Sequence, residues 1–407
     1  MLSETKGILK KAGFTLMAIT IYLLGSQVAV PAVKLTRHYQ QLMHESSVSA
    51  LAAMSGANLP KLSLFSIGFT PFMVAMMAVQ LALLMKLPYL RELSQRQILL
   101  LQNMLTMLIA VFEAHLLVGS ARLIDGPLAR ITAITALTAG AMLVTWLGNL
   151  NGSRGIGGMV VLIICNMMRS VAVQAGKLFH QLATNWQGWL LIIGIVLLSL
   201  GLIWFLAAFR LARYEDAQIR SYLPSYTPPL MYPIGLNLGV MMTFMIGTAL
   251  AVLPALIGTR LGHRTLLLNS QFQIGFAAGL TFLLTYFFAW LQFNPKQQAK
   301  QMLYTNSYLL NVQPGKPTQR YLRRRLVSLT FFGALLAMGV IVMSLSGSLI
   351  KNEWGSILQL MAQLIMLVMF MNGLIDKLDE LKIPRRYAKL KGELEDEVFR
   401  ADLAKRA

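Results

Sequence analysis

Residues 55–80 read SGANLPKLSLFSIGFTPFMVAMMAVQ, and this stretch decides how the rest of the chain is interpreted. Its first part, Leu59–Ile67, is apolar but too short to cross a bilayer, which takes about 20 residues. Gly68, Thr70 and Pro71 separate it from a full apolar span. Broken apolar segments at membrane depth are typical of channels and transporters. The stretch therefore predicts a short half-helix that folds back from the external side; the alternative is an interfacial helix lying on the outer leaflet.

The composition on either side of this stretch is that of a polytopic membrane protein. The 407 residues are 56% hydrophobic and 13% charged, whereas soluble domains carry about 25% charged residues. We therefore predict an all-α membrane protein with ten transmembrane helices, the first of them an uncleaved span. The ten apolar segments lie near residues 12–33, 70–88, 98–119, 131–148, 156–176, 188–209, 231–257, 273–293, 326–350 and 354–375.

The basic residues predict the orientation of these helices. The chain carries 36 Lys and Arg against 16 Asp and Glu. With the N-terminus inside, 26 of the 36 basic residues fall on cytoplasmic segments, as the positive-inside rule requires. We therefore expect a plasma-membrane protein with both termini in the cytoplasm. Nucleic-acid binding, the other common reason for a basic chain, does not fit so apolar a composition.

Chemistry-bearing residues are few. Cys165 is the single cysteine and the five histidines are scattered, so no disulfide, metal site or cofactor is expected. Glu113 and His115 lie near the external end of the third segment, where we expect both to reach the interface. Arg169 either reaches the outer interface because its helix ends early, or faces a water-filled cavity. The glycine-rich run 149–158 lacks the Lys-Ser/Thr ending of a phosphate loop and predicts a tight turn. The chain is therefore expected not to be an enzyme.

Four blocks resemble the SecY family, the channel subunits of the bacterial Sec protein translocase. Residues 22–31, YLLGSQVAVP, resemble the family's first-helix motif, and residues 62–80 resemble its plug and second helix. Residues 138–158, TAGAMLVTWLGNLNGSRGIGG, resemble the turn between its fourth and fifth helices. Residues 293–334 resemble the cytoplasmic loop that leads into its ninth helix. The blocks occur in the family's order over most of the chain.

The resemblance implies two inverted five-helix halves around a central pore. The halves would comprise residues 1–180, with a plug near 58–68, and residues 181–375, with a large cytoplasmic loop at 294–325, followed by a cytoplasmic tail at 376–407. It also implies an apolar pore ring of Phe69, Met73, Val160, Ile164 and Phe244. The plug residues would be Leu59, Leu62, Leu64, Phe65 and Ile67.

Departures from the family pattern fall on the cytoplasmic loops. Gln313 stands where the family has an arginine before Pro-Gly, Ser153 replaces a glutamate, and the loop after the sixth helix is short and lacks a family motif. The family's partners, a SecA-type ATPase motor and the ribosome, dock on these loops. The changed loops resemble those of the accessory SecY paralogue of Gram-positive bacteria. Motor docking would fall on Arg154, Arg213, Arg220, Lys316, Arg320, Arg323, Arg324 and Arg325.

The resemblance therefore implies a protein-conducting channel of the accessory Sec system. It would export serine-rich glycosylated adhesins as unfolded chains, with a dedicated SecA motor, small SecE-like membrane subunits and membrane lipid as partners. A housekeeping SecY channel is the first alternative. A secondary transporter or lipid-linked glycan flippase is the second, and the scarcity of charged residues within the spans counts against it.

Overall fold

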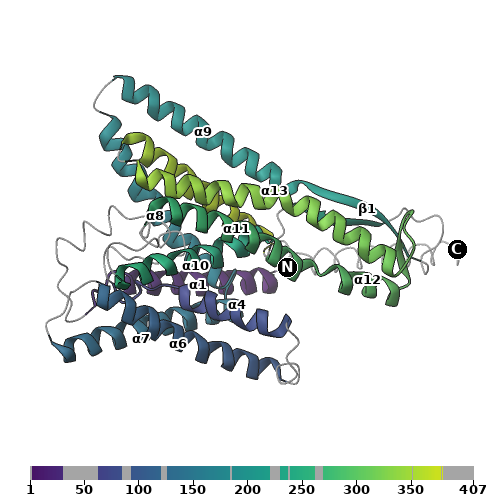
Figure 1. The fold of residues 1–407 in the computed structure, drawn as a ribbon, viewed down its shortest axis with the longest axis horizontal. Helices are drawn as coiled ribbons and strands as arrows, with labels where there is room; N and C mark the ends of the chain where they lie inside the picture. The colour runs from purple at the N-terminus through teal and green to yellow at the C-terminus, as the bar shows by residue number, and fades with distance from the viewer. Residues whose placement is uncertain are drawn as a thin grey trace.

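The structure, a computed structural model, describes residues 2–30, 63–84, 93–120, 126–183, 186–220, 230–236, 239–261, 269–350, 352–376 and 378. The predicted helical membrane part is confirmed, because the described residues contain a long helix at each of the ten predicted segments (Figure 1). Seven of them are long and apolar enough to cross a membrane. The ten are α1 (Leu2–Gly25), α4 (Thr70–Leu84), α6 (Gln95–Ser120), α7 (Pro127–Arg154), α8 (Met159–Leu182), α9 (Trp186–Leu211), α10 (Val240–Leu261), α11 (Ser270–Phe293), α13 (Lys316–Leu349) and the helix Glu353–Asp376.

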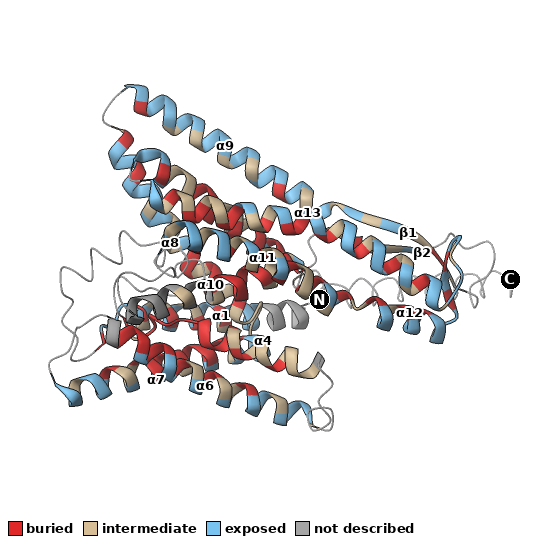
Figure 2. Ribbon diagram, viewed as in Figure 1, coloured by how far each residue is buried: buried red, intermediate tan, exposed pale blue. Residues whose placement is uncertain are grey.

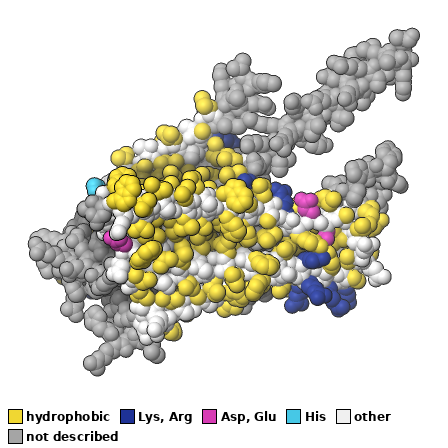
Figure 3. Space-filling view, turned by 90° about the horizontal axis from the view of Figure 1, so that it is seen from above, with side chains coloured by type: hydrophobic (Ala, Val, Ile, Leu, Met, Phe, Trp, Pro, Cys, Tyr) yellow, Lys and Arg dark blue, Asp and Glu magenta, His cyan; other side chains and the backbone are white. Residues whose placement is uncertain are grey.

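The outer surfaces of these helices are apolar, as lipid contact requires. In α9 only 6% of the most apolar window is buried within the chain, although its mean hydropathy is 2.8. Figure 2 shows α9 exposed along most of its length. Figure 3 shows a broad apolar surface, with Lys and Arg side chains gathered beyond one end of it. The chain is therefore a membrane protein, and most Lys and Arg side chains visible on this face lie toward one end of the apolar surface.

The helices pack in two sets that meet at α10. In the first set α4 lies against α6, α6 against α7, and α7 against α1 and α8. In the second, α11 lies between α10 and α13. The two sets are joined where α10 packs against both α4 and α6, and α8 also packs against α9 and the helix Glu353–Asp376. Figure 1 shows α4, α6 and α7 on one side of α10, and α13 and α9 on the other.

A small antiparallel sheet lies outside the ten long helices, and the sequence did not predict it. It consists of β1 (Arg213–Arg220), β2 (Leu230–Gly235) and β3 (Ser307–Leu309), in the order β2-β1-β3. Arg213 pairs with Gly235 and Gln218 with Leu230, while Gln218 also pairs with Leu309. The predicted span at 231–257 therefore begins too early, since α10 starts only at Val240. The apolar residues of β2 resemble the start of a membrane helix in the sequence, but they form a strand.

The predicted loop at 294–325 has secondary structure of its own. It contains α12 (Pro295–Tyr304), β3, a turn at Gly315 with φ +96° and the first turns of α13. A separate apolar core holds it together, formed by Ile234, Ala289, Phe293, Met302, Leu309, Leu322 and Leu326. We call the sheet, α12 and residues 316–325 of α13 the platform. Figure 1 shows the platform at one end of the helices, with the start of α1 facing that end.

The glycine-rich run between α7 and α8 forms the predicted tight turn. Gly157 and Gly158 have φ of +74° and +58°, which glycine adopts without steric cost. Asn151 Nδ2 donates to the carbonyl of Gly158 at 2.8 Å, and the amide of Ile156 donates to Thr15 Oγ1 of α1 at 2.8 Å. The turn thus fixes α1, α7 and α8 to one another.

Candidate pore, plug and platform

The five predicted ring residues lie in one continuous buried apolar cluster. Phe69 is the last residue before α4, and the others belong to α4, α8 and α10. Val160 and Ile164 are one helical turn apart and so share a face of α8. The exposed fractions of the five side chains are 0% for Phe69, 2% for Met73, 3% for Val160, 5% for Ile164 and 0% for Phe244. These helices therefore bring together side chains separated by up to 175 residues of sequence.

The predicted plug segment is firmly packed where the structure describes it. Phe65 and Ile67 are buried and Leu64 is partly buried, whereas Leu59 and Leu62 lie outside the described residues. Residues 64–69 form turns rather than the expected half-helix. Ser63 forms a β-bridge with Ala29, and the amide of Leu64 donates to the carbonyl of Val28 at 2.8 Å. These pairings with the chain after α1 use backbone groups that a helix would need for itself, which accounts for the difference.

Two glycines make room for this segment. A Cβ at Gly25 of α1 would overlap the ring of Phe65, and a Cβ at Gly140 of α7 would overlap the carbonyl oxygen of Leu64. Neither φ is in the left-handed region, so the requirement for glycine is steric. The segment is therefore seated in notches on α1 and α7.

Tyr22 is a contact that the sequence did not single out. Its ring stacks on Phe65 at 5.9 Å and on Phe69 at 6.0 Å between centroids. Tyr22 is 2% exposed. It thus joins the plug segment to the ring. The sequence feature that could have indicated this role is the position of Tyr22 as the first residue of the first-helix motif.

Glu113 is buried, so the expectation that it reaches the interface is wrong. It is 6% exposed, and its Oε2 accepts a hydrogen bond from Thr70 Oγ1 at 2.8 Å. The same hydroxyl lies 2.8 Å from the carbonyl of Ile67. A carboxyl group on α6 therefore sits at the junction of the plug segment and α4. His115, two residues further along α6, is exposed on the chain.

Arg169 is held within α8, which continues to Leu182. The alternative in which that helix ends early is therefore wrong. Arg169 Nη1 donates to Ser26 Oγ at 2.9 Å, and Ser26 Oγ donates to the carbonyl of Leu23 at 2.7 Å. Ser26 lies two residues before Val28, which pairs with the plug segment. The guanidinium group thus braces the end of α1 on which that segment rests.

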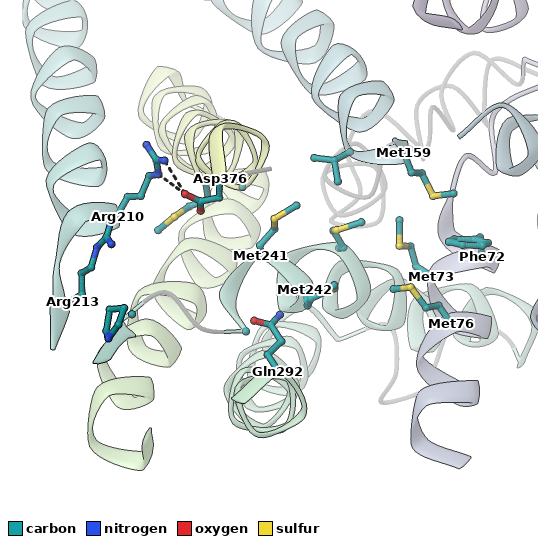
Figure 4. Close-up of a pocket in the computed structure, with 17 residues that line it drawn as sticks. Phe72, Met73, Met76, Met159, Arg210, Arg213, Met241, Met242, Gln292 and Asp376 are labelled. Atoms are coloured by element: carbon teal, nitrogen blue, oxygen red, sulfur yellow. Dashed lines mark hydrogen bonds and ion pairs between the residues drawn. The ribbon is translucent and has the colours of Figure 1, made fainter. Parts of the chain in front are cut away.

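A cavity of about 750 Å³ lies between the ring and the platform. Phe72, Met73 and Val160 line it near the ring, whereas Arg210, Arg213 and Asp376 lie nearer the platform (Figure 4). Arg210 donates from Nε and Nη2 to Asp376 Oδ1 at 2.9 and 2.8 Å, joining the ends of α9 and the helix Glu353–Asp376. The cavity is therefore charged at the end near Arg210 and Asp376 and apolar at the end near Phe72 and Met73.

The platform is braced by a polar cluster between β1 and α13. Tyr321 Oη donates to Asp216 Oδ1 at 3.1 Å, and Arg325 Nε donates to Tyr321 Oη at 3.2 Å. The Arg325 guanidinium group also lies 4.3 Å from the centroid of the Tyr214 ring, within cation–π range. Tyr232 Oη donates to Gln298 Oε1 at 3.0 Å, and burial raises the pKa of Tyr232 to about 12.

The predicted docking residues divide into exposed and engaged groups. The exposed side chains are those of Arg154, Arg213, Lys316, Arg320, Arg323 and Arg324. Arg325 is partly buried and bound within the platform. The backbone of Arg220 pairs with Ser307, and its side chain lies outside the description. Arg320, Arg323 and Arg324 therefore form the part of the predicted surface that is both clustered and free to meet a partner; Arg323 also lies 5.4 Å from the Trp290 ring centroid.

The fold defined by these helices is that of protein-conducting channels. A structure described as the structure of a protein conducting channel superposes with a TM-score of 0.65 at 16% identity, over 92% of this chain and 93% of the other. A SecY structure described in terms of its plug domain gives 0.62 at 17% identity, again over 92% and 93%.

Sequence similarity gives the family. The SecY family model matches residues 63–380. The accessory Sec system protein translocase subunit SecY2 of Lactobacillus johnsonii is 32% identical over 94% of this chain and 97% of its own length. The protein translocase subunit SecY of Lactococcus lactis subsp. lactis is 26% identical over 86% and 87%. The chain belongs to the SecY family, and its resemblance to the accessory paralogue is confirmed.

Proposed function

We propose that this chain is the channel subunit of an accessory Sec translocase that moves unfolded polypeptides across the plasma membrane. The observation that carries the proposal is the buried cluster of Phe69, Met73, Val160, Ile164 and Phe244, with the plug segment packed beside it. A ring of apolar side chains excludes ions by dewetting, yet offers a passing chain no strong contact. Methionine suits such a ring because its side chain adapts to varied shapes.

The proposed pathway runs from the cavity through the ring. The chain would enter at the charged end of the cavity near Arg210 and Arg213, pass Met73 and Val160, and displace the plug segment from the notches at Gly25 and Gly140. The contacts that hold the segment closed are aromatic stacking and a few hydrogen bonds. Such contacts are broken and remade without covalent change. The driving free energy would come from ATP hydrolysis by a partner.

The platform is the proposed docking surface for a SecA-type motor. Its exposed arginines would face the cytoplasm if both termini are inside, an orientation supported by the distribution of basic residues along the chain. The small SecE-like subunits and lipid would share the apolar outer surface, of which α9 is the most exposed part. Nucleic acid is not a proposed partner.

The proposed substrates are serine-rich glycosylated adhesins. These substrates follow from the proposed accessory subtype, which is supported by the greater identity to the Lactobacillus johnsonii accessory subunit than to the housekeeping SecY of Lactococcus lactis subsp. lactis, 32% against 26%. The altered docking loops point the same way, because a different loop surface favours a dedicated motor. A housekeeping channel is the remaining candidate, whereas membership of the SecY family leaves the transporter alternative without support.

Transport in reconstituted proteoliposomes tests the proposal. The chain, its small membrane subunits and either SecA-type motor are supplied with an ordinary secretory precursor or with a serine-rich adhesin precursor. Protease-protected adhesin, formed only with the dedicated motor and ATP, is the expected result. Equal transport of the ordinary precursor with the housekeeping motor would contradict the accessory role and favour a housekeeping channel.

Motor docking is tested separately by charge reversal. Replacing Arg320, Arg323 and Arg324 with Glu should weaken motor binding, and the remaining binding should depend less on salt. The matched control is Lys296→Glu with Lys300→Glu on α12, which changes exposed charge on the same platform. Equal loss of binding in both variants would show a general charge effect rather than a docking site.

A further inference from the structure

Methionines dominate the wall of the cavity. Seven of the seventeen residues that line it are methionines, although the chain has 25 in 407 residues. They come from four helices that are distant in sequence, and Figure 4 shows several of their side chains directed into the same space. The seven are Met73, Met76, Met159, Met241, Met242, Met245 and Met369.

The cavity methionines differ in access to water. Met73, Met245 and Met369 are 2%, 7% and 1% exposed. Met76, Met159, Met241 and Met242 are partly exposed. The wall also carries Arg210, Arg213, Asp376 and Gln292. Charged groups keep water in their neighbourhood, so we expect the end of the cavity near Arg210 and Arg213 to be hydrated and small aqueous solutes to reach the four partly exposed thioethers.

We propose that Met76, Met159, Met241 and Met242 form an oxidation-sensitive site that lowers transport when a peroxide reaches the cavity. A sulfur lone pair attacks one oxygen of hydrogen peroxide, the O–O bond breaks, and the sulfoxide and one molecule of water are formed. The sulfur loses two electrons and the peroxide gains them. A thioreductant-driven methionine sulfoxide reductase reverses the change.

The effect follows from the change in polarity. A thioether is soft and apolar, whereas a sulfoxide is polar and a strong hydrogen-bond acceptor. Met76 and Met159 line the same wall as the ring residues Met73 and Val160. Sulfoxides there would hold water and polar groups beside the ring, and the wall would lose the adaptable apolar character that suits it to varied side chains. The transport consequence rests on the proposed function, whereas the chemical reactivity of the site does not.

Mass spectrometry tests the site without any transport assay. The full chain in proteoliposomes is treated with hydrogen peroxide, and the added oxygen is mapped to each methionine. The expected result is several-fold faster oxidation of the four cavity methionines than of Met104 and Met107. These two α6 residues are 70% and 53% exposed on the chain but face the apolar, lipid-covered surface. Equal or slower oxidation in the cavity would overturn the proposal.

Transport after oxidation tests the consequence. The variant M76L/M159L/M241L/M242L, and the smaller variant M241L/M242L in case the first does not fold, are compared with the variant M104L/M107L. For each protein, the amount of precursor transported after peroxide treatment is divided by the amount transported without it. Wild type and M104L/M107L should lose most transport and regain it with the reductase, while the cavity variants keep theirs. Equal loss in all variants would overturn the regulatory role. Absence of transport before treatment would instead refute the proposed function. The oxidation-sensitive site would then be judged by the mass spectrometry alone.

Discussion

The ring of Tyr22 stacks on the ring of Phe65, with centroids 5.9 Å apart and an interplanar angle of 10°. This contact joins α1 to the segment that precedes α4, and the second stack, on Phe69, extends it to the ring. Any movement of Phe65 therefore changes the surroundings of Tyr22 and Phe69, so we expect the seating of the segment to affect the proposed seal.

Phe65→Ala should open the resting channel. Loss of a buried phenylalanine costs about 3–5 kcal/mol, and here the loss falls on the seated segment. We expect a higher leak of small ions from proteoliposomes without motor or substrate. Phe112→Ala, on the exposed surface of α6, is the control and should not leak. A tight Phe65→Ala channel would mean that the segment does not seal the pore.

Gly140→Ala should destabilise the protein, although alanine is the better helix former by up to about 1 kcal/mol. The added methyl group would overlap the carbonyl oxygen of Leu64. Gly176→Ala in α8 meets nothing within 4 Å and should be neutral or slightly stabilising. Thermal unfolding in detergent compares the two. Equal melting temperatures would contradict the close seating of residues 63–69.

The Arg169–Ser26 hydrogen bond predicts coupled effects on the seal. Arg169→Leu and Ser26→Ala should each raise the leak, and the double variant should leak no more than the stronger single one. Removing a cation from a membrane helix should not reduce abundance, because a charge near the bilayer centre costs about 2.5–3.5 kcal/mol. Fully additive leaks would show that the two side chains act independently.

Tyr232 should titrate unusually high. Burial favours the neutral phenol and raises its pKa to about 12 from 10.0. The contribution of neutral Tyr232 to the stability of the platform is therefore fully present below pH 10. It is lost as the pH rises from 10 through 12. The difference in tyrosinate absorbance between wild type and Tyr232→Phe should therefore show a transition near pH 12. A transition at 10 would contradict the burial of this side chain.

The helices could be predicted from sequence because length and hydropathy suffice for membrane spans, as at α9 and α11. The sheet could not, because β1 is polar and its pairing with Ser307–Leu309 joins residues about 90 positions apart. The burial of Glu113 was missed for the same reason, since its partner Thr70 is 43 residues away. The ring residues could be predicted only from the resemblance to the family. Within an apolar helix, one apolar residue is not distinguished from the next by residue type.

The central claim is that a polypeptide passes through the ring, and a disulfide crosslink tests it most directly. Cys165 is replaced by Ala, a single cysteine is placed at Phe69 or Met73, and a cysteine-bearing adhesin precursor is arrested halfway across the membrane with motor and ATP. A crosslink at both positions, absent from a control cysteine at the lipid-facing Met104, is the predicted result. No crosslink at either position, with the precursor demonstrably arrested in the same vesicles, would contradict the account.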